Sequence, residues 1–327
     1  MYTGTTDMFE AQSALTSIAP DAVKWILIAL TAGFMVKMAI VPVHMWLPDA
    51  HSEAPATMSA LLSGVIISAG AYAIIRLSMG IVFPAVGLDF GVFFLHALTI
   101  FGVISAFFGS LIALVETDIK RIIAYSSIAH MGYVMFGISL FPAILANGTT
   151  TVALAEAGAV AIVGTVLHLI THAASKGLFF LSAGSVMHQT ELRDVDEMGG
   201  LAGKMPYTAV TSTTAALSIA GAPPFACFIS EFLIFVGAFE IINADSFYLL
   251  PTALMLVATV LSLAYSLRFI SKVFLGQPKV TVESVKQIIR DVPIYMKVAM
   301  GILVVLVVLL GVYPTLFLSL INTVKFG

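Results

Sequence analysis

Residues 158–186 read GAVAIVGTVLHLITHAASKGLFFLSAGSV, an apolar run long enough to cross a bilayer as a helix. Three titratable groups interrupt it, His168, His172 and Lys176, at intervals of four residues. That spacing places them on one slowly drifting stripe, about 12 Å from first to last. A charged group at the bilayer centre costs at least about 2.5–3.5 kcal/mol, so the stripe indicates a functional role. A lone histidine in an apolar helix more often serves packing, but three groups in register favour a path for protons.

The composition extends this interpretation to the whole chain. The chain has 327 residues, of which 60% are hydrophobic and 10% charged, and its mean hydropathy is +1.05. An ordinary soluble domain carries about 25% charged residues, so a soluble globular protein is excluded. A net charge of −3 excludes nucleic acid as a partner. The single cysteine, Cys227, cannot make a disulfide, an iron–sulfur cluster or a structural zinc site, so we expect neither a cofactor nor a metal.

Similar apolar runs on both sides of this segment predict an all-α, polytopic membrane helix bundle of about eight transmembrane helices. The predicted crossings are 24–46, 56–79, 91–115, 121–141, 158–186, 207–240, 247–274 and 297–322. The residues from Gly276 to Lys297 mix charges with Val and Ile, which predicts an amphipathic surface helix before the last crossing.

The basic residues outside the spans predict the orientation of the bundle. Ten Lys and Arg fall in loops on one side, around Asp49, Lys120, Arg193 and Lys286, and three fall on the side of the termini. Positive charge favours the cytoplasm, so we expect a multi-pass protein of the cell membrane, surrounded by lipid, with both termini on the non-cytoplasmic side.

Two of the predicted crossings contain prolines that should break the helix. Pro42 follows Lys37 by five residues, and Pro223 and Pro224 precede Glu231. Paired interrupted helices with a charged residue beside each break indicate an ion site. We therefore predict two discontinuous helices, with Lys37 and Glu231 in an ion path; the alternative for Lys37 is a lysine that snorkels to the interface.

Two further histidines lie in apolar runs. His130 could line the same interior as the ion path or serve as a hydrogen-bonded packing residue, and these two readings are about even. His96 has no titratable companion in the sequence, so packing is the better reading there. Glu240 and Asp245 fall near an outer end, where we expect them to be solvated.

Several stretches together resemble one known family. They are residues 41–55 (VPVHMWLPDAHSEAP), 117–127 (TDIKRIIAYSS), the helix with His168 to Lys176, and 311–314 (GVYP). These resemble the antiporter-like subunits of proton-pumping respiratory complex I, of membrane-bound hydrogenases and of multisubunit sodium/proton antiporters. The resemblance runs from about residue 24 to near the end. It implies a module with two inverted repeats, each with a discontinuous helix, joined by a polar axis.

The resemblance also implies roles for individual residues. Lys37 matches the lysine on the first broken helix, and Lys176 matches the central lysine of the second half-channel, with His168 and His172 as companions. Glu231 matches the terminal position on the second broken helix. The chain departs from the family at Ser68, where many relatives carry a lysine.

The resemblance further implies a division of the chain. Residues 1–23 form a polar or interfacial segment, 24–79 the last two helices of a first repeat, 80–275 a complete second repeat, and 276–327 the amphipathic helix and the final crossing. The earlier helices of the first repeat, with the glutamate that pairs with Lys37, have no counterpart here. We expect either that another subunit supplies them or that the first half-channel is inactive.

Three functions remain open from the sequence. The first is a proton- or sodium-translocating subunit of an oxidoreductase related to complex I, of the hydrogenase-like or sulfur-reducing kind, in which other membrane subunits carry the electrons. The second is a subunit of a non-redox sodium/proton antiporter, and the third is a shortened structural spacer. No nucleophile–base pair or phosphate loop indicates an active site of the chain's own.

Overall fold

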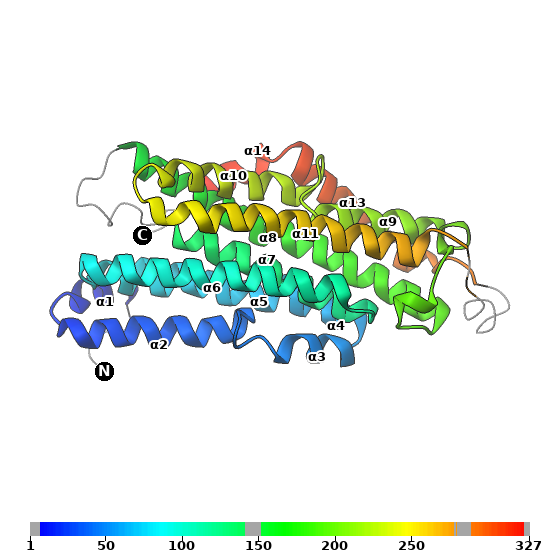
Figure 1. Ribbon diagram of the computed structural model, residues 1–327, viewed down its shortest axis with the longest axis horizontal. Coiled ribbons are helices and arrows are strands. Elements are labelled where there is room, and N and C mark those ends of the chain that lie inside the picture. Colours follow the sequence, from blue (N-terminus) through cyan, green and yellow to red (C-terminus); the bar gives the residue numbers. More distant parts are fainter. Residues whose placement is uncertain (1–6, 141–151, 278, 280–288, 324–327) are drawn as a thin grey trace.

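The computed structural model describes residues 7–140, 152–277, 279 and 289–323, and over this part the predicted all-α bundle is confirmed. The helices run along the long axis of the molecule, with α7 and α8 between the layer of α2 and α6 and the layer of α10 and α11 (Figure 1). The continuous crossings are Ala56–Ala85 (α4 and α5 with their π-helical and 3₁₀ extensions), α6 (Leu88–Val115), α7 (Ile119–Ser139), α8 (Val152–Thr190), α11 (Leu249–Phe274) and α13 (Ile294–Val312). Each contains a segment long and apolar enough to span a bilayer, so the chain is a multi-pass membrane protein.

The two crossings predicted to be discontinuous are indeed broken. In the first, α2 (Pro20–Met38) ends at Ala39, which adopts a left-handed conformation, and α3 (Trp46–Glu53) begins after the turn that contains Pro42. In the second, α9 (Pro206–Ile219) and α10 (Ala226–Ile242) flank Gly221, which has a φ of 65°, and the two prolines 223 and 224. Proline cannot donate a backbone hydrogen bond, which is why a continuous helix cannot pass these points.

Helix α7 forms the centre of the bundle because its neighbours approach it closely. All of the residues from Ile119 to Ser139 except Arg121 are buried. A Cβ atom built on Gly132 of α7 would lie 2.5 Å from the carbonyl oxygen of Gly102, and one on Gly109 of α6 would lie 2.6 Å from the amide nitrogen of Ala129. Only glycine permits this spacing, so α6 and α7 pack backbone against backbone.

Ion pairs connect the loops at the end of the bundle where the sequence concentrates its basic residues. Asp118 caps α7 by accepting hydrogen bonds from the amides of Lys120 and Arg121, at 2.8 and 3.0 Å. Its other oxygen accepts from Arg193 Nε at 2.9 Å. Nearby, Nζ of Lys272 lies 2.9 Å from Oδ1 of Asp196. We call these contacts of Asp118 and Asp196 together the loop clasp. It ties the α6–α7 turn, the loop after α8 and the end of α11 together.

Two predicted segments differ from the structure. The last crossing, predicted as one helix over 297–322, ends at Val312, and a separate helix α14 (Thr315–Thr323) follows. A proline disfavours helical geometry at the residue before it, and Tyr313 precedes Pro314. Of the predicted surface helix at 276–297, residues 278 and 280–288 lie outside the described residues, 289–293 are not helical, and 294–297 form the start of α13. A short helix α1 (Met8–Leu15) occupies part of the predicted N-terminal interfacial segment.

Candidate functional site

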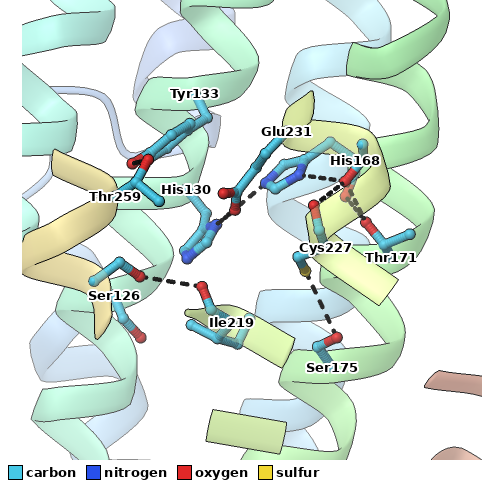
Figure 2. A network of polar contacts seen from close by, with 12 residues as sticks. Ser126, His130, Tyr133, His168, Thr171, Ser175, Ile219, Cys227, Glu231 and Thr259 are labelled. Atoms are coloured by element: carbon cyan, nitrogen blue, oxygen red, sulfur yellow. Dashed lines mark hydrogen bonds and ion pairs between the residues drawn. The ribbon is translucent and has the colours of Figure 1, made fainter. Parts of the chain in front are cut away.

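Three titratable side chains from three helices meet inside the bundle (Figure 2). His130 of α7 places its Nδ1 3.2 Å from Nε2 of His168 on α8 and 3.8 Å from Oε1 of Glu231 on α10. Both histidines are fully buried and Glu231 keeps 5% of its surface exposed. We call these three residues the polar triad. The structure thus places His130 beside His168 and Glu231, two of the residues predicted to line the ion path.

Hydroxyl groups lie within hydrogen-bond distance of the second ring nitrogen of His168 and of His130. Nδ1 of His168 is 2.9 Å from Oγ of Ser230, and Nε2 of His130 is 3.4 Å from the hydroxyl of Tyr265 on α11. Because each ring has one nitrogen held by a hydroxyl, its orientation is fixed and its other nitrogen faces the triad.

Lys176 lies fully buried on α8 and binds α7 rather than its own helix. Its Nζ donates to the carbonyl oxygen of Ile123 at 3.1 Å and to Oγ of Ser126. The Ser126 hydroxyl lies near the hydroxyl of Tyr265. A series of neighbouring polar groups therefore leads from Lys176 past Ser126 and Tyr265 to His130. We call this series the buried polar chain.

The three residues of the predicted stripe on α8 are not joined in sequence order along the helix, as their spacing suggests. His172 lies between His168 and Lys176 in the sequence, but neither of its ring nitrogens has a hydrogen-bond partner among the described residues. Its ring centroid is 6.2 Å from that of His168 and 5.6 Å from that of His130. The hydrogen bonds of His168 and Lys176 run across helices, from α8 to α7 and α10, and not along α8.

The break between α9 and α10 positions Glu231. A Cβ atom on Gly221 would lie 2.5 Å from Oε2 of Glu231, so the carboxylate packs directly against the backbone of the break. The left-handed conformation of Gly221 lets the chain turn there without a side chain in the way. Pro223 and Pro224 contribute to the site indirectly. They help to end α9 before the position that the carboxylate of Glu231 on α10 occupies.

Lys37 lies apart from this cluster. Its side chain is exposed on α2, and it makes no hydrogen bond or ion pair with any described residue. A cavity of about 510 Å³ between α2 and α6 is lined by Met35, Pro42, Phe94 and nine further side chains, and Lys37 is not among them. The expected acidic partner is therefore not found within the described part of this chain.

His96 does have a companion, which corrects the prediction that it has none. Nε2 of His96 is 2.8 Å from Oδ2 of Asp245, and its ring stacks on Phe247 with centroids 3.7 Å apart. Asp245, expected to be solvated, is only 21% exposed as a side chain. The pair lies where α6 meets the turn before α11, and the distance of 149 residues between them hid it from the sequence.

His51 lies on α3, between the basic end and Lys176. It is fully buried and stacks on Phe180 of α8 at 4.5 Å, and neither ring nitrogen has a partner among the described residues. Lys176 and Lys120 both lie within electrostatic reach of it. Lys120 donates to the carbonyl oxygens of Ser52 at 3.4 Å and of Ala54. His51 belongs to the stretch 41–55 that resembles the known family, but no role was predicted for it from the sequence.

The site residues that the sequence missed are Ser126, Tyr265 and His51. Ser126 and Tyr265 are polar residues within apolar stretches, which is the one signal that the sequence offers for them, whereas His51 lies in a polar stretch between Pro48 and Pro55. Serine and tyrosine are common in membrane helices, so that signal does not distinguish a packing hydroxyl from a conducting one.

Comparison with known proteins places the chain in a family. A family model described as NADH:quinone oxidoreductase/Mrp antiporter, transmembrane, matches residues 1–262. NADH-quinone oxidoreductase subunit M of Pseudomonas aeruginosa is 33% identical over 303 residues, which cover 91% of this chain and 52% of that protein. Hydrogenase-4 component B of Escherichia coli is 32% identical over 303 residues, which cover 90% of this chain and 43% of that one.

One solved structure resembles the chain at the level of both sequence and fold. It is the archaeal membrane-bound sulfane sulfur reductase, with a TM-score of 0.77 and 30% identity over 95% of this chain and 48% of the matched one. The chain thus spans about half the length of the curated relatives that it matches.

Proposed function

The chain belongs to the NADH:quinone oxidoreductase/Mrp antiporter transmembrane family, and we propose that it is an antiporter-like, ion-translocating subunit of a membrane-bound oxidoreductase. The observation that carries the proposal is the buried polar chain from Lys176 through Ser126 and Tyr265 to the polar triad. A series of hydroxyls and imidazoles inside an apolar bundle is costly to bury, and it provides the donors and acceptors along which a proton can move.

Within this proposal the groups have separate roles. Lys176 is the central group that gains and loses a proton, His130 and His168 pass the proton on, and Glu231 exchanges it at the break. His172 has two buried nitrogens without a partner in the part of the chain that the structure describes, and such nitrogens are suited to hold ordered water. His172 would extend the path through that water. Residues 80–275 would be the complete repeat that carries these groups.

The route toward the basic end passes His51. Its ring lies between Lys176 and Lys120, and water bound at its free nitrogens would bridge the remaining gap. By the positive-inside rule this end faces the cytoplasm and both termini lie outside. We therefore propose that protons enter the path from the cytoplasmic side near Lys120.

Lys37 supports a role for other membrane subunits. An exposed ammonium on an otherwise apolar helix face is unfavourable in lipid, because a charge there lacks a partner. A membrane helix that carries a carboxylate would satisfy it. The relatives suggest a complex of the hydrogenase-like or sulfur-reducing kind, since one is a hydrogenase component and another belongs to a sulfane sulfur reductase.

The experiment that tests the function replaces Lys176 by Ala in the whole complex. The complex is purified with its partner subunits, reconstituted in proteoliposomes and supplied with its electron donor. We expect the variant to assemble and to lose coupled ion translocation, while electron transfer persists or slows. Translocation at the wild-type rate would show that the buried polar chain does not conduct.

A non-redox sodium/proton antiporter is the second candidate, because the matched family model includes Mrp antiporters. The two functions differ in the partners of the chain. Purification of the intact complex from native membranes separates them: co-purifying subunits with redox centres support the first, and a complex without them supports the second.

A further inference from the structure

The polar triad has the composition and geometry of a transition-metal site. Its three ligand atoms, Nδ1 of His130, Nε2 of His168 and a carboxylate oxygen of Glu231, all lie within 4.8 Å of one another. Ligands bound tetrahedrally at the 2.0–2.1 Å typical of zinc lie about 3.3 Å apart. The two nitrogens here are 3.2 Å apart, and His130 Nδ1 is 3.8 Å from Oε1 of Glu231. Small side-chain movements would bring all three to bonding distance.

The surroundings of the triad complete the arrangement that metal-binding histidines require. A ligating histidine normally has its second ring nitrogen held by a hydrogen bond, which fixes the ring. The Ser230 hydroxyl does this for His168 at 2.9 Å, and the Tyr265 hydroxyl does it for His130 at 3.4 Å. The two imidazoles are therefore held with their ligand nitrogens toward a common point.

A fourth group lies close to the same point. His172 is fully buried, its two nitrogens have no partner among the described residues, and its ring is 5.6 Å from that of His130, centroid to centroid. A buried imidazole without a hydrogen bond is costly, and binding of an ion would remove that cost. The fourth coordination position would be filled by His172 or by water.

We propose that His130, His168 and Glu231 bind a divalent transition-metal ion of the zinc type. Two imidazoles and one carboxylate suit Zn²⁺, Co²⁺ or Ni²⁺, whereas Mg²⁺ and Ca²⁺ require more oxygen ligands. Glu231 beside the break is the only member of the triad with exposed surface, so the ion would reach the site from that side.

The consequence for transport rests on the proposed function. A bound ion would occupy the two nitrogens that pass protons and would link α7, α8 and α10. Zn²⁺ would therefore inhibit translocation by a mechanism separate from any effect on electron transfer. Binding itself does not depend on this role.

The test measures binding directly. The wild-type complex is freed of metal with a chelator and titrated with Co²⁺ and with Zn²⁺, and bound metal is measured by mass spectrometry and by visible and X-ray absorption. We expect the tetrahedral absorption of Co²⁺ and an X-ray signal from two imidazoles. Glu231→Gln and His168→Gln should each weaken this binding at least tenfold.

The matched control is His44→Gln. His44 is also a buried histidine with two unpartnered nitrogens, but it contacts Phe108 and no member of the triad. It should bind the metal as the wild type does. Equal binding by the wild type and the Glu231 variant, or wild-type zinc without imidazole ligands, would overturn the proposal. Metal binding together with zinc-insensitive translocation would keep the site and refute instead the role of the triad in the ion path.

Discussion

Glu231 is buried, yet among the described residues it has no basic side chain in direct contact apart from His130, at 3.8 Å. A carboxylate in this position can take up a proton and release it as the neighbouring imidazole changes its charge. It also packs directly against the backbone at Gly221, beside the break between α9 and α10. These properties suit a group at which the path exchanges protons with its surroundings.

We expect Glu231→Gln to leave the complex assembled and to reduce ion translocation at least tenfold, because the amide keeps the shape but cannot carry the proton. Glu231→Asp should retain part of the activity. Glu240→Gln is the control, since Glu240 is on the same helix but exposed. Translocation is measured in proteoliposomes at matched electron-transfer rates. Equal rates for the Gln variant and the wild type would leave Glu231 a purely structural role.

Tyr265 provides a sharper test of the buried polar chain because one atom is removed. Tyr265→Phe deletes the hydroxyl between Ser126 and His130, and we expect slower translocation with the complex intact. Tyr248→Phe removes a buried hydroxyl of the same kind, which donates to the carbonyl oxygen of Ser139 and lies outside the chain. The ratio of ions moved to electrons transferred should fall only in the first variant; a fall of the same size in both would point to packing rather than conduction.

The sequence predicts the charged members of this site better than its hydroxyls. Lys176, His168 and Glu231 stand out because a titratable group in an apolar run is costly wherever it lies. Ser126 and Tyr265 do not stand out, because their proposed role depends on which side chains of neighbouring helices lie beside their hydroxyls. The cross-helix contacts of Lys176 also could not be read from its spacing to His172, because spacing describes one helix and not its neighbours.

At the scale of elements, the two broken helices follow directly from proline, whereas other helix ends do not. Pro42 and the pair 223–224 predicted where α2 and α9 stop. The end of α13 at Val312 was missed, although Pro314 gives the same signal, because the apolar run continues past it. Helix α8 extends to Thr190 beyond its predicted end, since polar residues at a helix end do not prevent helical hydrogen bonds.

The break before α10 can be tested with Gly221→Ala. The left-handed φ of 65° disfavours a side chain by about 1–2 kcal/mol, and the added Cβ would meet Glu231 Oε2 at 2.5 Å. We expect a lower melting temperature and impaired translocation. Gly33→Ala on α2, where a Cβ meets nothing within 4 Å, should be neutral or stabilising. If both variants melt alike and translocate normally, the break does not position Glu231.

At the scale of the whole molecule, the loop clasp should make stability depend on pH. The Lys272 ammonium, 2.9 Å from the carboxylate, together with the charges of Arg268 and Lys279, lowers the pKa of Asp196 below its ordinary value. A carboxyl whose pKa is lowered by folding stabilises the folded state above its unfolded pKa and loses that contribution as the pH falls through the folded pKa. Because Asp196 is 43% exposed as a side chain, the effect should stay at or below about 1 kcal/mol.

Asp196→Asn should therefore melt at a lower temperature than the wild type near pH 7, and the difference should shrink toward zero as the pH falls below about 4. Thermal unfolding of the purified complex over this range measures it. The comparison with the wild type removes the contribution of the other carboxyl groups. A difference that is constant over the whole range would mean that the charge of Asp196 does not contribute to the clasp.

The orientation of the bundle can be decided with the protein's own cysteine content. Cys227 is the only cysteine and is fully buried, so a membrane-impermeant thiol reagent should not label the wild type. Gly203 and Ser246 are exposed and lie on either side of the broken crossing formed by α9 and α10, in the loops before and after it. A cysteine introduced at each position therefore reports one side of the membrane.

In intact cells we expect the reagent to label Ser246→Cys and not Gly203→Cys. In inside-out vesicles we expect the reverse, because Arg193 and Lys204 place the loop before α9 in the cytoplasm. The opposite pattern would invert the bundle and move the access side of the path to the far end, while labelling of both variants from one side would show that α9 and α10 together do not cross the membrane.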